Sequence, residues 1–590
     1  MRIATALGLA ALLAGSLTAC NDGNSIPDAN KSTTPGTLIQ SPPLRLASLN
    51  KADFAAQLSA SASGQQLLAI AGAPTCGVDF HYFQYQTVDA KGLPTSASGA
   101  LMAPTGGTGC SGARPILVYT HGTAVTKSYN IANITDPTNE AWTESAMMAA
   151  FFAAHGYIVV ASNYAGYDTS PLPYHPYLNA DQQSKDVINA LVAARTALAG
   201  GLPSGDTDNG RLFVTGYSQG GHVAMATVRA MQTASPPIAV TAAMPMSGPY
   251  AMLAFGDAAV AYSSPSLGGT IYYPMIINSY QQAYGNIYNA LTDVYNPLFA
   301  PGIDTLIPGQ YTFTTLITSG KLPQFALFNS TTPGTGTEPG TGIPALDRAL
   351  AAPSAASNPI GALGFGNPYL IMNSVRIQYA LDAAGTPDGL VPAPTTLMPP
   401  SGTPSYGLRA ALKTNDLRGW NPTMPIMLCG GMNDPEVFYQ INTLTMKALW
   451  TGNPYVAGVV DVDPTTNGNT ANAGQVGTVI GTIAAGVFAT EPSGTPVAKI
   501  SADVQTAVAA YPAFSTFFAA PGKPNSAQGV MVLGLAGVAG QAVAYYIGQG
   551  VTSPVAMGAD VGNAIIANYH FPLTQSACEV AAQAFFASVP

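Results

Sequence analysis

Apolar and polar positions along the chain follow the two periods of regular secondary structure. Short runs rich in β-branched and aromatic residues predict strands at 78–88, 96–103, 115–120, 157–162, 211–215, 238–244, 425–428 and 456–462. Helical spacing covers about 51–68, 139–154 and 181–198, the residues after 219, and segments ending near 449 and 587. Because strands and helices alternate from residue 115 onward, the pattern predicts an α/β fold with a mostly parallel sheet and two antiparallel strands at one edge.

This alternation is interrupted twice, which divides the expected core into the parts 51–250, 421–463 and 563–590. Residues 251–420 form a first insertion, in which Tyr280, Tyr284 and Tyr288 are four residues apart and so share one helical face. Residues 464–562 form a second insertion rich in Ala, Gly and Val. Its segment 530–547 has the apolar character of a membrane span, but its small residues, Gln541 and flanking glycines favour a buried or substrate-facing helix.

The sequence Gly216-Tyr217-Ser218-Gln219-Gly220 lies where the predicted strand 211–215 must turn sharply into a helix. This GxSxG pattern in a strand–turn–helix context is typical of a nucleophile elbow, in which small residues allow the strand and the helix to approach closely. We therefore expect Ser218 to be a nucleophile at the carboxyl end of a central strand.

A serine nucleophile needs a base, and the chain contains only six histidines. His570 alone follows the last strand region, and a histidine there gives the chain order nucleophile, acid, histidine. Asp434 follows the strand 425–428 and is the expected acid, which would orient His570 and stabilise its imidazolium. Glu436 is the second choice for the acid, Asp461 and Asp463 follow it, and a role of Asp434 as a helix N-cap remains open.

The oxyanion of such a reaction requires two preorganised donors. The expected donors are the backbone amide of Gln219, directly after the nucleophile, and that of Thr123, after the strand 115–120 and the His-Gly pair. For any single tyrosine of the first insertion, packing on the core is the ordinary interpretation. Together the tyrosines indicate an apolar acyl or aryl cleft, and we assign Tyr217, Tyr250 and Tyr284 to substrate binding.

Only 8% of the 590 residues are charged and the net charge is -9, which argues against nucleic acid as a partner because there is no basic stripe to neutralise phosphates. The N-terminus has the basic start and short apolar run of a signal peptide, residues 1–19. It ends in Leu-Thr-Ala-Cys, which resembles a bacterial lipobox and predicts that Cys20 carries lipid. Residues 20–50 then form a flexible tether, and the protein is anchored to the bacterial envelope, or secreted if the lipobox is not used.

Four cysteines remain in this exported chain, and they allow three disulfide connectivities. The pairing we favour joins Cys76 to Cys110, which braces the N-terminal strands, and Cys429 to Cys578, which holds the acid and the histidine in register. No spacing suggests zinc, so neither a metal nor a cofactor is expected.

The motifs YTHGT, SNYAGY followed by a helix, and GYSQGG, with a large insertion after the next strand, resemble the secretory lipase family of Candida lipase A and its bacterial relatives. The resemblance covers residues 73–250, 425–463 and 570 onward, and the chain departs from the family between residues 463 and 570. It implies an α/β-hydrolase fold, hydrolysis of carboxylic esters, and a lid formed by the insertion 251–420.

The leading hypothesis is thus an exported serine esterase or lipase acting on small-molecule, lipid or polymeric esters with apolar acyl or aryl parts. One alternative is a serine exopeptidase of the prolyl aminopeptidase type, which needs carboxylates to hold the substrate's ammonium group. The other is a surface-binding lipoprotein that keeps the hydrolase fold without catalysis.

Overall fold

The computed structural model of the chain describes residues 33–356, 358–464, 476–512, 514–515, 526–550 and 553–590. The expected signal peptide, Cys20 and the first part of the expected tether lie outside these residues.

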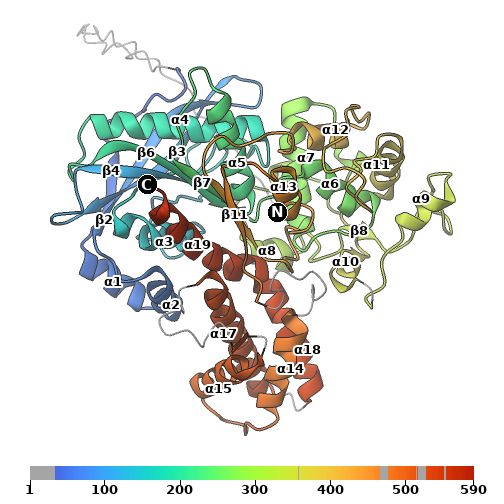
Figure 1. Cartoon of the computed structure of the whole chain (residues 1–590). Coiled ribbons are helices and arrows are strands. Elements are labelled where there is room, and N and C mark those ends of the chain that lie inside the picture. The colour runs from blue at the N-terminus through green and yellow to red at the C-terminus, as the bar shows by residue number, and fades with distance from the viewer. Residues whose placement is uncertain (1–32, 357, 465–475, 513, 516–525, 551–552) are drawn as a thin grey trace, which may run out of the picture. The chain divides into compact units, whose positions relative to one another are not determined.

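A nine-stranded sheet forms the centre of the molecule, with the strand order β1-β2-β3-β5-β4-β6-β7-β10-β11 (Figure 1). The pairs from β1 to β5 are antiparallel, and all pairs from β5 to β11 are parallel. The strands are β1 (Leu44–Leu49), β2 (Gly77–Val88), β3 (Pro94–Thr105), β4 (Ala113–Thr120), β5 (Ile158–Ser162), β6 (Thr207–Tyr217), β7 (Ala242–Met246), β10 (Ile426–Gly430) and β11 (Val456–Asp461). The predicted α/β fold with a mostly parallel sheet is confirmed.

Helices cover both faces of this sheet (Figure 1). On one face α4 (Ala180–Ala199) packs beside α5 (Gln219–Thr233), and on the other α3 (Trp142–Phe151) contacts α19 (Gln575–Ser588). The strands contribute fully buried side chains such as those of Leu117, Val159 and Val214, and these join the helices in one continuous apolar core. This layering is what the alternating sequence pattern requires.

Two predictions near the N-terminus are wrong. The expected tether 20–50 includes the strand β1, which pairs with β2 and packs Leu46 and Leu49 against the core. The expected helix 51–68 is two helices, α1 (Lys51–Ser59) and α2 (Ala62–Ala71). The break has a local cause, because the Ser61 side chain accepts the backbone N–H of Gly64 and so caps the start of α2.

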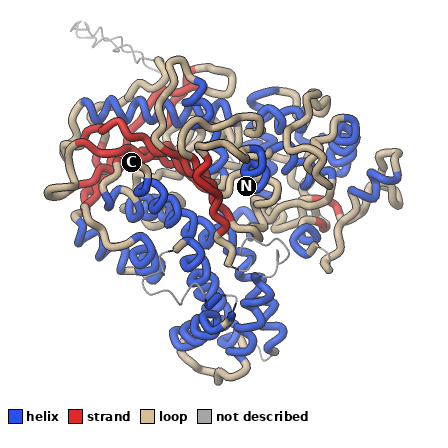
Figure 2. The backbone as a smooth tube through the Cα atoms, in the orientation of Figure 1, coloured by secondary structure: helices blue, strands red, loops and turns tan. Residues whose placement is uncertain are grey.

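The first insertion lies between β7 and β10 and consists of helices joined by long loops (Figure 2). Its elements are α6 (Met252–Gly256), α7 (Gly269–Tyr284), α8 (Phe313–Thr318), α9 (Pro344–Ala349), α10 (Pro359–Leu363), α11 (Asn373–Gly385), α12 (Gly407–Thr414) and a small sheet of β8 (Phe328–Asn329) and β9 (Phe365–Gly366). It has an apolar cluster of its own and a buried ion pair of Arg409 with Asp257 at 2.7 Å. The expected three-tyrosine face is wrong, because α7 ends at Tyr284, before Tyr288.

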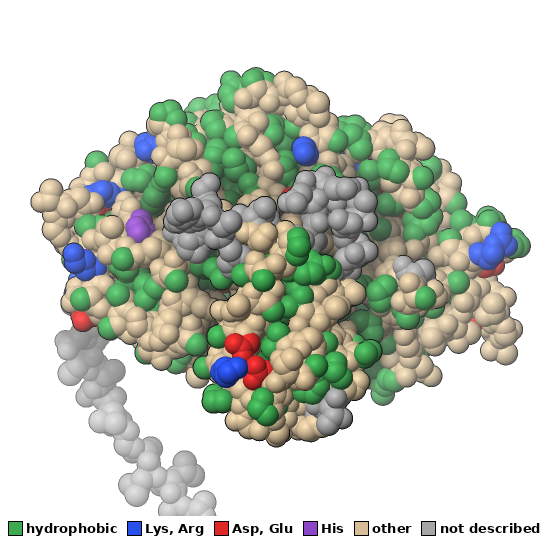
Figure 3. All heavy atoms as spheres, turned by 60° about the horizontal axis from the view of Figure 1, so that its bottom comes forward, with side chains coloured by type: hydrophobic (Ala, Val, Ile, Leu, Met, Phe, Trp, Pro, Cys, Tyr) green, Lys and Arg blue, Asp and Glu red, His purple; other side chains and the backbone are tan. Residues whose placement is uncertain are grey.

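Among the described residues, the second insertion contributes long helices that extend away from the sheet (Figures 1 and 2). They are α14 (Val476–Phe488), α15 (Val497–Ala510), α17 (Ala527–Gly548) and α18 (Pro554–Asn568). The α14 and α18 backbones approach closely at Gly481, where a Cβ would lie 2.2 Å from the carbonyl oxygen of Gly558. Figure 3 shows that charged side chains are sparse on the face that includes this bundle.

Helix α17 is long and apolar enough, by length and composition, to cross a membrane. Within the molecule 61% of its most apolar window is buried, and Met531, Leu535 and Ala539 join the main core. This burial agrees with the sequence-based expectation of a buried helix.

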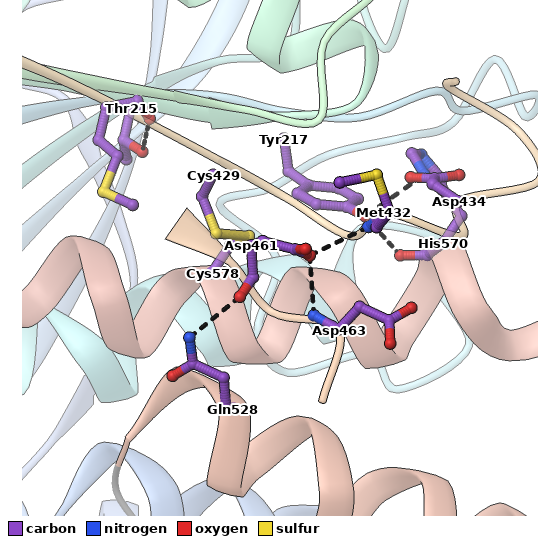
Figure 4. The surroundings of a disulfide bond; sticks show 11 residues. Thr215, Tyr217, Cys429, Met432, Asp434, Asp461, Asp463, Gln528, His570 and Cys578 are labelled. Carbon is purple, nitrogen blue, oxygen red and sulfur yellow. Dashed lines mark hydrogen bonds and ion pairs between the residues drawn. A yellow bond between two sulfur atoms is a disulfide. The ribbon is translucent and has the colours of Figure 1, made fainter. Parts of the chain in front are cut away.

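Both favoured disulfides are present. Cys76 and Cys110 connect the segments that precede β2 and β4. Cys429 at the end of β10 is joined to Cys578 in α19, and Figure 4 shows this bridge beside the loop that carries Asp434.

Candidate active site

Ser218 lies at the turn between β6 and α5 in a backbone conformation with a φ of 60° and a ψ of -122°. The turn is possible because glycines flank it. A Cβ on Gly216 would lie 1.9 Å from the Thr120 hydroxyl oxygen, and one on Gly220 would lie 1.9 Å from the Thr120 carbonyl oxygen. The structure thus has the sharp elbow that the GxSxG pattern predicts.

Ser218, His570 and Asp434 form a continuous chain of hydrogen bonds. The Ser218 Oγ is 2.7 Å from the Nε2 atom of His570, and the His570 Nδ1 atom is 2.6 Å from an Asp434 carboxylate oxygen. Because the carboxylate can only accept, Nδ1 carries the proton and Nε2 is free to accept the serine hydroxyl. This is the arrangement in which an imidazole can remove a proton from serine.

The turn that carries Asp434 fixes the direction of its carboxylate. The second carboxylate oxygen accepts the backbone N–H groups of Glu436 and Val437 at 2.9 and 3.0 Å. The residue therefore combines the N-cap-like bonding that the sequence left open with the contact to His570.

The neighbouring carboxylates hold the loops around the site together and do not contact His570. Asp461 accepts the backbone N–H groups of Met432 and Asp463 (Figure 4). Asp463 accepts the Tyr569 hydroxyl. The acid loop, the end of β11 and the histidine segment are thus connected by polar contacts as well as by the Cys429–Cys578 disulfide.

Tyr217 is not among the residues that line the cavity next to Ser218. It is buried at the end of β6, its hydroxyl donates to the His570 carbonyl oxygen at 2.6 Å, and its ring lies 4.9 Å from the imidazole (Figure 4). The residue before the nucleophile therefore holds the histidine segment in place.

Three other histidines near the elbow have different partners. His222 contacts the Asn415 carbonyl oxygen, and His121 stacks between Tyr129 and Tyr164. His175 bonds to the Ala165 carbonyl oxygen through Nδ1 and to the Gln219 side chain through Nε2. Its burial lowers its pKa to about 3, so it is neutral and suited to holding that side chain.

The pKa of His570 is raised above the ordinary value of 6.5. Burial acts to lower it, but the charges of Asp434 and Glu436 and the hydrogen bond to Asp434 outweigh burial.

A base must be neutral to accept a proton, so kcat/KM is expected to be lost as the pH falls through the raised pKa of His570. Asp434→Asn and Glu436→Gln remove raising charges, so in each the acidic limb of the pH profile should move to lower pH. A limb that stays in place in both variants would assign the titration to another group.

The segment after β4 passes directly beside the nucleophile. A Cβ on Gly122 would lie 4.0 Å from the Cβ of Ser218. Two glutamates hold this segment by its backbone: Glu144 accepts the N–H of Gly122 at 3.0 Å, and Glu140 accepts those of Val125 and Thr126.

Thr123 and Ala124 lie between these anchored positions, and their N–H groups have no acceptor among the described residues. Gln219 is the first residue of α5, so its N–H has no acceptor within the helix. The expected oxyanion donors, the amides of Thr123 and Gln219, are thus available on segments that meet at Ser218.

Glu144→Ala is expected to lower kcat about 10- to 100-fold with little change in KM. The variant removes the acceptor for the Gly122 amide and for the Tyr119 and Tyr129 hydroxyls, so the oxyanion segment loses its fixed position. Steady-state kinetics on one ester would measure the effect. Glu144→Gln, which keeps a carbonyl acceptor, should recover much of the loss, whereas equal changes in kcat and KM for both variants would point to general destabilisation.

A cavity of about 50 Å³ lies next to Ser218 and Gln219, beneath the first insertion. Apolar side chains form most of its wall, and the polar side chains on it are two serines, Gln219, three tyrosines and a glutamate. The lining residues are Tyr177, Leu178, Ser218, Gln219, Pro249, Met252, Phe255, Gly256, Ala259, Ser266, Tyr272, Tyr273, Ile276, Leu408, Leu412, Glu436 and Val437. A larger hollow of about 930 Å³ lies between the acid loop, α14 and α18, and Ser218 does not line it.

Two expected substrate-binding residues lie outside the cavity lining. Tyr250 is fully buried in the core. Tyr284 is 38% exposed at the end of α7, and its hydroxyl accepts from Asn415. The tyrosines that line the cavity are Tyr177, Tyr272 and Tyr273, which the four-residue spacing did not select.

The two glutamates that hold the oxyanion segment were also missed, although Glu140 and Glu144 are four apart at the start of α3, the first helix after the His-Gly pair. That spacing is the signal that could have found them. No group of His, Cys, Asp and Glu suited to a metal occurs among the described residues.

No family model matches the chain, and no similar curated protein was found. Among solved structures, the chain is similar to the rice cell wall degrading esterase LipA from Xanthomonas oryzae, with 25% identity over 74% of this chain and 93% of that one and a TM-score of 0.55. A hydrolase from Legionella pneumophila shows 18% identity over 72% and 91% of the two chains, with a TM-score of 0.52. Candida antarctica lipase A in its closed state is more distant, with 11% identity over 72% and 76% and a TM-score of 0.39. By fold the chain is therefore an α/β-hydrolase, similar in structure to a bacterial esterase.

Proposed function

We propose that the protein is an exported serine carboxylesterase that hydrolyses esters with an apolar acyl part through an acyl-enzyme on Ser218. The observation that carries the proposal is the Ser218–His570–Asp434 hydrogen-bond chain beside a mostly apolar cavity. The structural likeness to an esterase supports the same class of reaction.

Each step of the reaction follows from this geometry. The Ser218 Oγ attacks the ester carbonyl carbon while His570 Nε2 takes its proton, and Asp434 stabilises the resulting imidazolium. The amides of Thr123 and Gln219 bind the oxyanion of the tetrahedral intermediate. His570 then gives the proton to the departing alcohol. In the second half, His570 removes a proton from water, the hydroxide attacks the acyl carbon, and Ser218 regains its proton as the acid leaves.

The enclosed cavity is assigned to the acyl chain, because that part stays bound while the alcohol leaves and water enters. Its volume of about 50 Å³ is several times the ~10–15 Å³ that one water needs, so it holds a few carbon atoms with the insertion in this position. Longer chains would require the insertion to move.

kcat/KM for p-nitrophenyl esters is expected to rise from acetate to at least butyrate or hexanoate. Each buried methylene contributes about 0.8 kcal/mol, which is roughly a fourfold gain. Ala259→Leu narrows the cavity and should lower hexanoate turnover relative to acetate. Tyr284 lies outside the lining, so Tyr284→Ala should leave the dependence of kcat/KM on acyl-chain length unchanged. A steep fall beyond acetate in the wild type would contradict an apolar acyl site.

Export is part of the proposal, and two disulfides support it, since such bonds persist in oxidising compartments. Lipid on Cys20 stays a prediction. Because LipA is described as a cell wall degrading esterase, esters attached to plant cell wall material belong in the substrate screen.

A further inference from the structure

One carboxyl group in the cavity has no part in the proposed reaction. Glu436 lies two residues after Asp434, and its side chain lines the cavity together with Ser218. Its Oε2 atom accepts the Tyr272 hydroxyl from the lid helix α7, whereas its Oε1 atom has no hydrogen-bond partner among the described residues. Among the described residues that line the cavity, Glu436 is the one charged residue.

Glu436 has both polar and apolar neighbours in the lining of the cavity. Tyr272 and Tyr177 lie near the carboxyl group, and the Tyr177 hydroxyl is already engaged with the Thr123 side chain at 2.7 Å. Much of the remaining lining is aliphatic or aromatic, as in Met252, Ile276 and Leu412. A few polar groups on an apolar wall are the usual means by which a site fixes the orientation of a ligand.

A ligand that displaces water from a carboxylate oxygen in such a cavity must supply a donor in its place. Tyr272 uses one oxygen, so the other is open to a donor on the acyl chain. Burial raises the pKa of Glu436.

On the basis of the proposed function, we propose that Glu436 is a specificity-determining residue that selects esters with a hydroxyl group on the acyl chain. A hydroxyl donates one hydrogen bond to Oε1 and loses little hydration on entry. An ammonium group loses far more hydration, and the lining supplies only this one carboxyl group, whose charge Tyr272 already partly offsets. The rest of a short hydroxyacyl chain would pack against apolar side chains of the cavity lining.

The matched substrates are ethyl butyrate and its 2-hydroxy and 3-hydroxy derivatives, and pH-stat titration would measure their hydrolysis. The wild type is expected to favour at least one hydroxy derivative about tenfold or more in kcat/KM, the range of one hydrogen bond to a charged group. Glu436→Leu should reverse this ratio, and Glu436→Gln, which keeps an acceptor, should retain part of it. Glu491→Gln in the second insertion is the matched control and should keep the wild-type ratio.

Three results would overturn the assignment: no preference for a hydroxy derivative in the wild type, the same ratio in Glu436→Leu, or a stronger preference for ethyl 3-aminobutyrate. Fluorophosphonate labelling of Ser218 in each variant verifies that its site is assembled. If no ethyl or p-nitrophenyl ester is hydrolysed, the proposed esterase function is contradicted, and the role of Glu436 falls with it. If Glu436→Leu is active and keeps the wild-type ratio of kcat/KM values for the hydroxy and unsubstituted esters, only the role of Glu436 is contradicted.

Discussion

Ser218→Ala is expected to abolish ester hydrolysis, with kcat falling about 10⁴-fold or more. The serine oxygen is the atom that forms the covalent bond to the acyl group, and an alanine side chain offers no replacement. The fold should be retained because the Ser218 side chain has one hydrogen-bond partner, His570, and a methyl group fits the same turn. Steady-state kinetics on the best p-nitrophenyl ester and thermal unfolding would measure the two quantities.

Ser279→Ala is a suitable control for this variant. Ser279 is fully buried in the helix α7 of the first insertion and its hydroxyl has no partner among the described residues, so its loss should change kcat/KM little. Substantial turnover in Ser218→Ala, well above that of a heat-denatured sample, would point to another nucleophile.

His570→Ala is expected to be nearly as damaging as Ser218→Ala, because the members of a triad act as a unit. Asp434→Asn should cost somewhat less. The asparagine amide can donate toward Nδ1 and so favours the tautomer in which Nε2 cannot accept the serine proton, but the serine and histidine remain. The Ser218→Ala/His570→Ala double variant should be no worse than either single variant.

His175→Ala tests this assignment of the base. His175 is buried, neutral and bonded to the Gln219 side chain, so its loss should disturb the elbow much less than the loss of His570. If His570→Ala keeps most activity while His175→Ala does not, the base has been assigned to the wrong histidine.

The central sheet and the positions of Ser218, Asp434 and His570 could be predicted because each depends on local pattern or chain order. A GxSxG between a strand and a helix fixes the elbow, and few histidines leave few alternatives for the base. Strand β1 was missed because none of the six residues of this edge strand is fully buried and it follows a segment rich in serine and proline. The strand forms by pairing with β2, and a local sequence pattern does not reveal that pairing.

The cavity wall could not be predicted, because it depends on how the insertion folds back on the core. Tyr272 meets Glu436 across 164 sequence positions, and no local pattern encodes that contact. Helical spacing selected Tyr284, which lies on the same helix as Tyr272, but the end of α7 carries it away from the cavity. Tyr217 was assigned to substrate binding with the other tyrosines, whereas its side chain at the end of β6 lies against His570.

The most direct test of the account is mass spectrometry of the enzyme after reaction with a fluorophosphonate, followed by peptide mapping. The account predicts one adduct per chain, on the Ser218 hydroxyl, formed in competition with the best ester substrate and absent from His570→Ala on the same time scale. An adduct on another residue, or none under conditions in which the wild type hydrolyses esters, would contradict an acyl-enzyme on Ser218.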